Sequence, residues 1–296
     1  MGAKRLIVNA DDFGFTRGVN AGIVEAFERG ILRSATLMAN GPAFDDAVRL
    51  ARQTPGLDVG CHLVLIGGRP LAQPGEYFPH SAVELAARLF GRYSVDWIER
   101  EFAAQIEKIA SAGIHPTHLD THKHTHLAPP VLEAMLRVAK RFGIRWIRRP
   151  FDLPLTAASN GASWKTKFAA AAVRPLGTRF ERKLRAAGLD ASDAFAGFQM
   201  TGRFRGAQLA ALVRALPDGL TEFMCHPGHC DAELRASPTR LTDSRQEELE
   251  ALTSNETLQA IRESEVEITS FAAESARFPD GPIADRNLRD GTPAVK

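Results

Sequence analysis

Residues 117–126 read THLDTHKHTH and carry a metal-ligand residue type at every second position. The five residues of this type are His118, Asp120, His122, His124 and His126. Side chains alternate between the two faces of an extended strand, so a strand here would point all five the same way. Because a strand rises about 3.3 Å per residue, one ion could contact only one or two of them. The segment therefore predicts a metal-centred active site that takes its other ligands from elsewhere in the chain.

Two adjacent carboxylates follow the first apolar run. Residues 5–10 read RLIVNA, and Asp11 and Asp12 come next. Like charges at a buried strand end repel each other, and a divalent cation bound by one carboxylate would relieve this and leave the other as a base. Adjacent side chains on a strand point apart, so a turn is required, and Gly14 permits it. The alternative is that an aspartate caps a helix beginning near Thr16.

Two histidines complete a ligand set. His62 lies inside the apolar run at residues 57–65, and His122 lies in the histidine-rich segment. Either one alone would more often be a packed core histidine. Together with Asp12 they supply one carboxylate and two imidazoles, which suits Zn²⁺ or a similar ion with positions left open for water and substrate. The sequence therefore predicts that Asp12, His62 and His122 bind one divalent metal, with Zn²⁺ as first choice and Mg²⁺ as the alternative.

Other members of the histidine-rich segment are expected to assist. Asp120 is the kind of carboxylate that orients a ligand histidine. His124 and His126 then support the site, contact the substrate or are exposed.

His226 stands where the apolar run at residues 220–225 meets Pro227. Residues 225–230 read CHPGHC, and two cysteines with two histidines suggest a structural zinc site. Spacing argues against it, because such sites join one closely spaced pair of ligands to a second, distant pair, and this chain has no second cysteine pair. A general-acid role for His226 is the preferred interpretation.

The element pattern predicts how these residues are positioned. Strands are expected at residues 5–10, 34–39, 57–65, 117–121, 145–149, 195–200, 220–225 and 266–271. Helices are expected at roughly residues 18–29, 42–53, 81–90, 95–112, 129–141, 164–187, 205–215 and 242–263. Strands that alternate with helices indicate a parallel sheet, here an α/β, TIM-barrel-like (β/α) barrel with the site at the carboxyl ends of its strands. A doubly wound open sheet is the alternative.

We expect a single barrel domain over residues 1–276 and a polar tail over 277–296. An unusual segment near 151–190 is inserted in the barrel. Residues 145–190 hold ten basic and three acidic residues, a charge of +7. Apolar residues are interleaved there: Phe151, Leu153, Leu155, Trp164, Phe168 and Phe180. The segment is either a solvated outer helix or a surface for an anionic membrane or lipid-linked substrate.

Composition narrows the function classes. The 296 residues are 44% hydrophobic and carry a net charge of +2, so charge alone gives no sign of nucleic-acid binding. Three cysteines are too few for a disulfide framework. No signal peptide and no apolar run of membrane-span length are seen, so we expect a cytoplasmic enzyme. The oligomeric state is not indicated.

Four ordered motifs resemble one family: NADDFG at 9–14, GCH at 60–62, THLDTHKHTH, and MCHPG at 224–228. They resemble the YdjC-like carbohydrate deacetylases, which include chitooligosaccharide deacetylases, and the N-terminal region is most similar to the hopanoid biosynthesis-associated branch, HpnK. The resemblance implies a metal-dependent N-deacetylase on a TIM-barrel-like fold. The family usually shows DSHHHVH where this chain has DTHKHTH, so His122 is kept and a histidine is replaced by Lys123.

The resemblance also implies roles. Asp12, His62 and His122 match the metal ligands, Asp11 the general base and His226 the acid. The hopanoid branch implies an N-acetylglucosaminyl hopanoid substrate and peripheral contact with the inner membrane face. The rival interpretations are a chitooligosaccharide deacetylase, a barrel phosphoesterase or amidohydrolase, and a non-catalytic carbohydrate- or lipid-binding protein.

Overall fold

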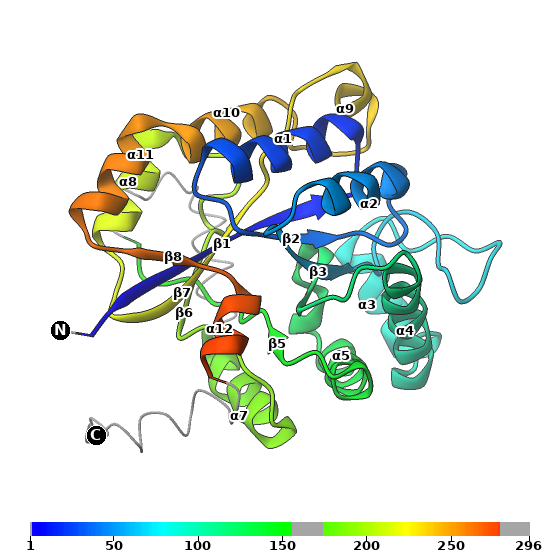
Figure 1. Ribbon diagram of the computed structural model, residues 1–296. Coiled ribbons are helices and arrows are strands. Elements are labelled where there is room, and N and C mark those ends of the chain that lie inside the picture. The colour runs from blue at the N-terminus through cyan, green and yellow to red at the C-terminus, as the bar shows by residue number, and fades with distance from the viewer. Residues whose placement is uncertain (1, 156–173, 279–296) are drawn as a thin grey trace.

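A parallel, curled β-sheet forms the centre of the molecule, and helices surround it (Figure 1). The computed structural model describes residues 2–155 and 174–278. Within these residues the strands are β1 (Lys4–Phe13), β2 (Ser34–Leu37), β3 (Asp58–Leu63), β4 (His118–Thr121), β5 (Trp146–Ile147), β6 (Ala194–Ala196), β7 (Gly219–Cys225) and β8 (Glu267–Thr269). All eight strands that the sequence predicts are present, and the α/β barrel prediction is confirmed.

The strand order is β5-β4-β3-β2-β1-β7-β6, with every pairing parallel. One edge of β1 pairs with β7 over residues 4–10. The other edge pairs with β8 at residues 5–7 and then with β2 from residue 9 onward. Single bridges from Trp146 to Asp190 and from Asp152 to Phe195 link the β5 side to the β6 side. The parallel order brings the carboxyl ends of the strands to one face, where barrel enzymes build their sites.

Helices cover the outside of this sheet (Figure 1). They are α1 (Arg17–Arg29), α2 (Phe44–Gln53), α3 (Ala82–Gly91), α4 (Val95–Ser111), α5 (Pro129–Phe142), α7 (Gly177–Ala187), α8 (Gly206–Arg214), α9 (Ala232–Ala236), α10 (Asp243–Thr253), α11 (Asn255–Glu263) and α12 (Phe271–Arg277). Two 3₁₀ helices are η1 (His122–Leu127) and η2 (Arg174–Leu176). None of the helices in the described residues is both long enough and apolar enough to cross a membrane.

The predicted helix at 242–263 is two helices, α10 and α11. They separate at Ser254, whose hydroxyl accepts a hydrogen bond from the Thr257 backbone N–H at 3.2 Å and so caps α11. The short helices α9 and α12 were not predicted. Arg277 belongs to α12, whereas residues 279–296 of the predicted tail lie outside the described residues. The division into a barrel domain and a tail stays a prediction.

The described part of the basic segment has both interior and exposed members: Arg179, Arg182 and Arg185 of α7 are exposed, whereas others are buried or paired. Phe151 and Phe180 are buried and pack edge to face, with ring centroids 5.4 Å apart. Arg148 is buried at 1% exposure, and Arg149 pairs with Glu181 at 2.7 Å. Residues 156–173, including Trp164, Lys165, Lys167 and Phe168, lie outside the described residues. The aromatic residues of the described part thus belong to the core, and the role of the whole segment stays a prediction.

Asp152 ties the chain after β5 to the chain after β6. Its carboxylate accepts backbone hydrogen bonds from Phe198 at 3.1 Å and Gln199 at 2.7 Å. Burial raises the pKa of Asp152 from 3.8 to about 6, and these backbone hydrogen bonds only partly oppose the rise.

This shift predicts a pH-dependent stability. Between about pH 4 and pH 6 the folded protein holds more protons at Asp152 than the unfolded chain, so the free energy of unfolding should fall as pH rises. Asp152→Asn should abolish this contribution, which is at most about 3 kcal/mol for a shift of about two pK units. Urea unfolding of both proteins from pH 4 to pH 7 measures it, and parallel pH profiles would contradict the assignment.

Candidate metal centre and active site

A bulge at the end of β1 brings the two adjacent aspartates to the same centre, where each lies close to His62. The register between β1 and β2 shifts between Ala10 and Phe13, and Asp12 has a left-handed backbone with φ 67°. The extra residue of a bulge breaks the alternation of side chains and re-aims them. The predicted turn therefore occurs within β1, at Asp12, and β1 continues to Phe13.

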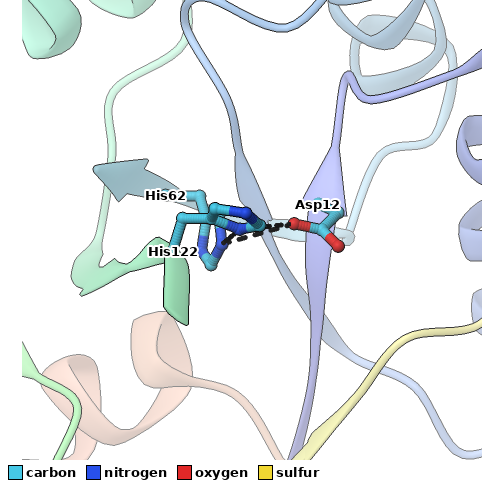
Figure 2. Close-up of side chains that lie close together, drawn as sticks. All are labelled: Asp12, His62 and His122. Carbon is cyan, nitrogen blue, oxygen red and sulfur yellow. Dashed lines mark hydrogen bonds and ion pairs between the residues drawn. The ribbon is translucent and has the colours of Figure 1, made fainter. Parts of the chain in front are cut away.

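The predicted ligand set converges. Asp12 Oδ1 lies 3.1 Å from His122 Nδ1 and 3.4 Å from His62 Nε2, and the two nitrogens are 3.3 Å apart (Figure 2). Ligand atoms placed tetrahedrally about 2.0–2.1 Å from one Zn²⁺ would be roughly 3.3–3.4 Å apart, so this spacing suits such an ion. Asp12 Oδ1 is also buried and has no hydrogen-bond partner in the described residues. The three side chains therefore fit a divalent metal.

Asp120 fixes the orientation of His62. Its Oδ1 lies 2.6 Å from His62 Nδ1, and the Thr36 hydroxyl donates to its Oδ2 at 3.1 Å. Burial alone would lower the pKa of His62, but the carboxylates of Asp120 and Asp11 raise it to about 10. With Nδ1 held by Asp120, Nε2 is directed at the metal position, as sequence reasoning expected of this aspartate.

Arg245, which sequence reasoning missed, holds the other oxygen of Asp12. Its guanidinium lies 2.5 Å from Asp12 Oδ2, and both side chains are buried. Burial opposes ionisation of Asp12, yet Arg245 and His122 hold its pKa well below the ordinary value. Asp12 is therefore ionised and has one oxygen, Oδ1, facing the histidines. No pattern around Arg245 in the sequence indicates a partner 233 positions away.

Arg148 was also missed, because it was counted with the basic surface. Its guanidinium nitrogens lie 2.9 Å and 2.8 Å from the two oxygens of Asp11, and 2.7 Å from both Asp120 and Glu222. Burial raises the pKa of Asp11 to about 7, against the lowering effect of Arg148. A carboxyl group that titrates near neutral pH can accept and release a proton at working pH. The position of Arg148, directly after the buried β5, was the signal available in the sequence.

His226 reaches the same centre from the end of β7. Its Nε2 lies 3.8 Å from Asp11 Oδ2, and its backbone N–H donates to Glu248 at 2.5 Å. Burial lowers the pKa of His226 to about 3. Burial thus disfavours the protonated ring, the form in which a histidine acts as a general acid.

The prediction that the side chains of residues 118–126 share one face of a strand is wrong beyond Thr121. β4 ends there, and η1 follows with left-handed backbones at Lys123 (φ 56°) and His124 (φ 51°). Alternation therefore holds for the two members inside β4, and the metal ligand His122 begins a new element. Nothing in the local sequence required this change, because neither Lys nor His favours a left-handed backbone as Gly does.

The other histidines of the segment are interior. His118 stacks on Phe271 with centroids 4.0 Å apart. His126 Nδ1 lies 2.5 Å from the Thr121 hydroxyl, and its Nε2 lies 3.1 Å from the carbonyl oxygen of Arg148. His126 thus supports the backbone of Arg148, in agreement with one of the roles left open for it.

Residues 225–230 do not form a metal cluster. Among the described residues, the Asp, Glu, Cys and His groups close enough to hold an ion are Asp12 with His62 and His122, and Asp11 with His62 and Asp120. Cys225 is buried with Sγ 3.5 Å from the Asn9 carbonyl oxygen. The structural-zinc alternative is therefore not supported.

Comparisons with known proteins show the family of this chain. Residues 5–263 match a family described as YdjC-like protein. A carbohydrate deacetylase from Geobacillus stearothermophilus is 36% identical over 273 residues, which cover 90% of this chain and 96% of that protein. A carbohydrate deacetylase from Clostridium beijerinckii is 32% identical over 279 residues, which cover 90% of this chain and 98% of that protein.

A solved structure from Enterococcus faecalis V583, described as a candidate cellobiose-phosphate cleavage protein, shares the fold. It has a TM-score of 0.73 and 24% identity, and the match covers 92% of this chain and 99% of that chain. The family match spans β1 to α11 and includes every side chain of the metal centre. The chain belongs to the family of YdjC-like proteins.

Proposed function

We propose that this protein is a metal-dependent carbohydrate N-deacetylase, which hydrolyses the acetamide of an N-acetylglucosamine-type sugar and releases acetate. The observation that carries the proposal is the convergence of a three-residue metal centre with Asp11 and His226, 3.8 Å apart. Amide hydrolysis needs a base for the attacking water and a proton for the departing amine. Relatives named carbohydrate deacetylase, alignable over 90% of the chain, support the same reaction.

Asp12, His62 and His122 would hold the ion, and Zn²⁺ is preferred because a ligand set of two histidines and one carboxylate favours it over Mg²⁺. The cation would polarise the acetamide carbonyl and lower the pKa of water. Asp11, oriented by Arg148, removes a proton from the attacking water as its oxygen bonds to the carbonyl carbon. The C–N bond then breaks, and the nitrogen leaves as an amine once it gains a proton.

His226 lies where it can carry that proton to the amine. The proton taken up by Asp11 can pass to His226 Nε2, which lies 3.8 Å from Asp11 Oδ2, and from there to the amine. The base and the acid therefore act in sequence on one proton, with acetate and a glucosamine as products.

This role predicts the result of His226→Ala. The variant should keep its metal and lose rate on an acetamide substrate by about 10²–10⁴-fold, the range for general acid–base catalysis. An N-acetylated substrate whose leaving amine has a low pKa should be affected less, because its departure needs less protonation. His229→Ala, at the half-buried histidine three positions later, is the matched control. Equal losses on both substrates would count against the acid role.

We further propose, from the family resemblance, that the sugar is carried by a hopanoid lipid and that the enzyme is cytoplasmic with peripheral contact at the inner membrane face. A chitooligosaccharide is the alternative substrate. The buried Phe151, Phe180 and Arg148 give this proposal no support. Acetate release from N-acetylglucosaminyl hopanoid in vesicles and from diacetylchitobiose, measured side by side, separates the two. Release of phosphate from a phosphorylated sugar, without acetate release, would replace both with a phosphoesterase.

A further inference from the structure

His124, two residues after the metal ligand His122, has a ring nitrogen without a hydrogen-bond partner among the described residues. The residue is 8% exposed, and this nitrogen, Nδ1, is buried. A buried polar atom in that state costs free energy unless water or a ligand satisfies it. The residue also has φ 51° and follows the left-handed Lys123, a conformation that is uncommon for residues other than glycine and that clusters at ligand sites.

The left-handed pair separates His124 from the metal ligand two residues earlier. His122 contacts Asp12 of β1, whereas His124 contacts Phe195 of β6, with ring centroids 6.0 Å apart, and Phe198 just after it, at 5.6 Å. Phe195 is buried and Phe198 is half-buried. His124 thus lies where the chain leaving β4 meets the chain leaving β6, on the face that carries the metal centre.

Phe195 and Phe198 form an aromatic wall beside His124. Asp152 holds the Phe198 end of this wall, because its carboxylate accepts the backbone hydrogen bonds of Phe198 and Gln199. Each imidazole nitrogen of His124 can take part in one hydrogen bond, and Nδ1 makes none within the described residues. An aromatic wall with a single hydrogen-bonding group suits a ligand with apolar faces and hydroxyl groups, as a pyranose ring has.

We infer that His124 and Phe198 form a sugar subsite beside the metal centre, in which His124 hydrogen-bonds one ring hydroxyl and Phe198 packs against the C–H face of the ring. This inference rests on the proposed function and assigns to His124 the substrate-contacting role among the three left open by the sequence. It makes His124 a specificity-determining residue that does not bind the metal.

The test compares His124→Leu with His124→Asn. Leucine removes the hydrogen bond, whereas asparagine places an amide near the Nδ1 position and tolerates a left-handed backbone. Each variant and the wild type is assayed for acetate release from diacetylchitobiose and from its 3-, 4- and 6-deoxy analogues, with metal content measured in parallel. Phe198→Ala and Phe198→Tyr test the wall without altering the left-handed pair.

The wild type should discriminate against one deoxy analogue by about tenfold or more in kcat/KM, because a site built to bind a hydroxyl rejects the analogue that lacks it. His124→Leu should lose this discrimination at unchanged metal content, and His124→Asn should keep part of it. Phe198→Ala should raise KM for every sugar, while Phe198→Tyr should not.

Unchanged discrimination in His124→Leu, or a loss of bound metal, would overturn the inference and leave the deacetylase proposal standing. A second measurement shows whether the proposed function fails as well: calorimetry of glucosamine disaccharide binding to the metal-stripped wild type. If that protein binds no sugar and the metal-loaded wild type releases no acetate, both the subsite and the proposed function are wrong.

Discussion

Replacing Asp11 by asparagine should lower the turnover of acetate release by about 10²–10⁴-fold, the range for removal of a general base. The bound metal and the affinity for the sugar should change little. Asparagine keeps the size of the side chain and one oxygen for Arg148, which contacts both carboxylate oxygens of Asp11 at 2.8–2.9 Å. It cannot accept a proton from water near neutral pH. Single-turnover acetate release together with metal analysis measures both properties.

Asp45→Asn is the matched control, because Asp45 is an exposed aspartate in the first turn of α2. It should behave as the wild type. If Asp11→Asn instead loses its metal, the roles of Asp11 and Asp12 have been exchanged. That outcome would move the base to the residue that Arg245 contacts.

Replacing His62 by alanine should remove the metal and abolish acetate release. The loss of metal affinity should exceed about 100-fold, since even residues that only orient a metal ligand typically contribute 10–100-fold. His122→Ala should behave alike, because the two nitrogens and Asp12 Oδ1 lie within 3.4 Å of one another. Dialysis against buffered Zn²⁺ followed by elemental analysis gives the affinity.

His229→Ala controls for a general effect of losing a histidine, because that side chain is 40% exposed and pairs with Glu25. It should keep a full metal content and full activity. Full metal content in His62→Ala would show that the ion, if one binds, is held elsewhere.

The barrel could be predicted from the sequence because each of its strands is recognised from neighbouring residues. Each strand is a short apolar run, and a parallel sheet places the carboxyl ends of its strands on one face. Asp11, Asp12, His62 and His226 all lie in or directly after such runs, so their convergence followed from the element pattern. His122 follows β4 in the same way, although the alternation argument that first drew attention to it fails after Thr121.

The ion-pair partners of the two arginines were not predictable because they are remote in the sequence. Arg148 meets Asp11 across 137 positions and Arg245 meets Asp12 across 233, and no local spacing reports such pairs. The net charge of +7 over residues 145–190 is a poor guide to the surface for the same reason. The sum includes Arg148, a buried residue whose charge is neutralised by carboxylates of β1, β4 and β7.

The most direct test of the account is a metal titration of the stripped wild-type protein with acetate release as the readout. Protein freed of metal by a chelator should release no acetate from an N-acetylated sugar. Addition of Zn²⁺ should restore the activity in proportion to the ion added and reach a plateau at one ion per chain, with Mg²⁺ restoring less. Full acetate release by the stripped protein, or no acetate release at any Zn²⁺ or Mg²⁺ concentration, would contradict it.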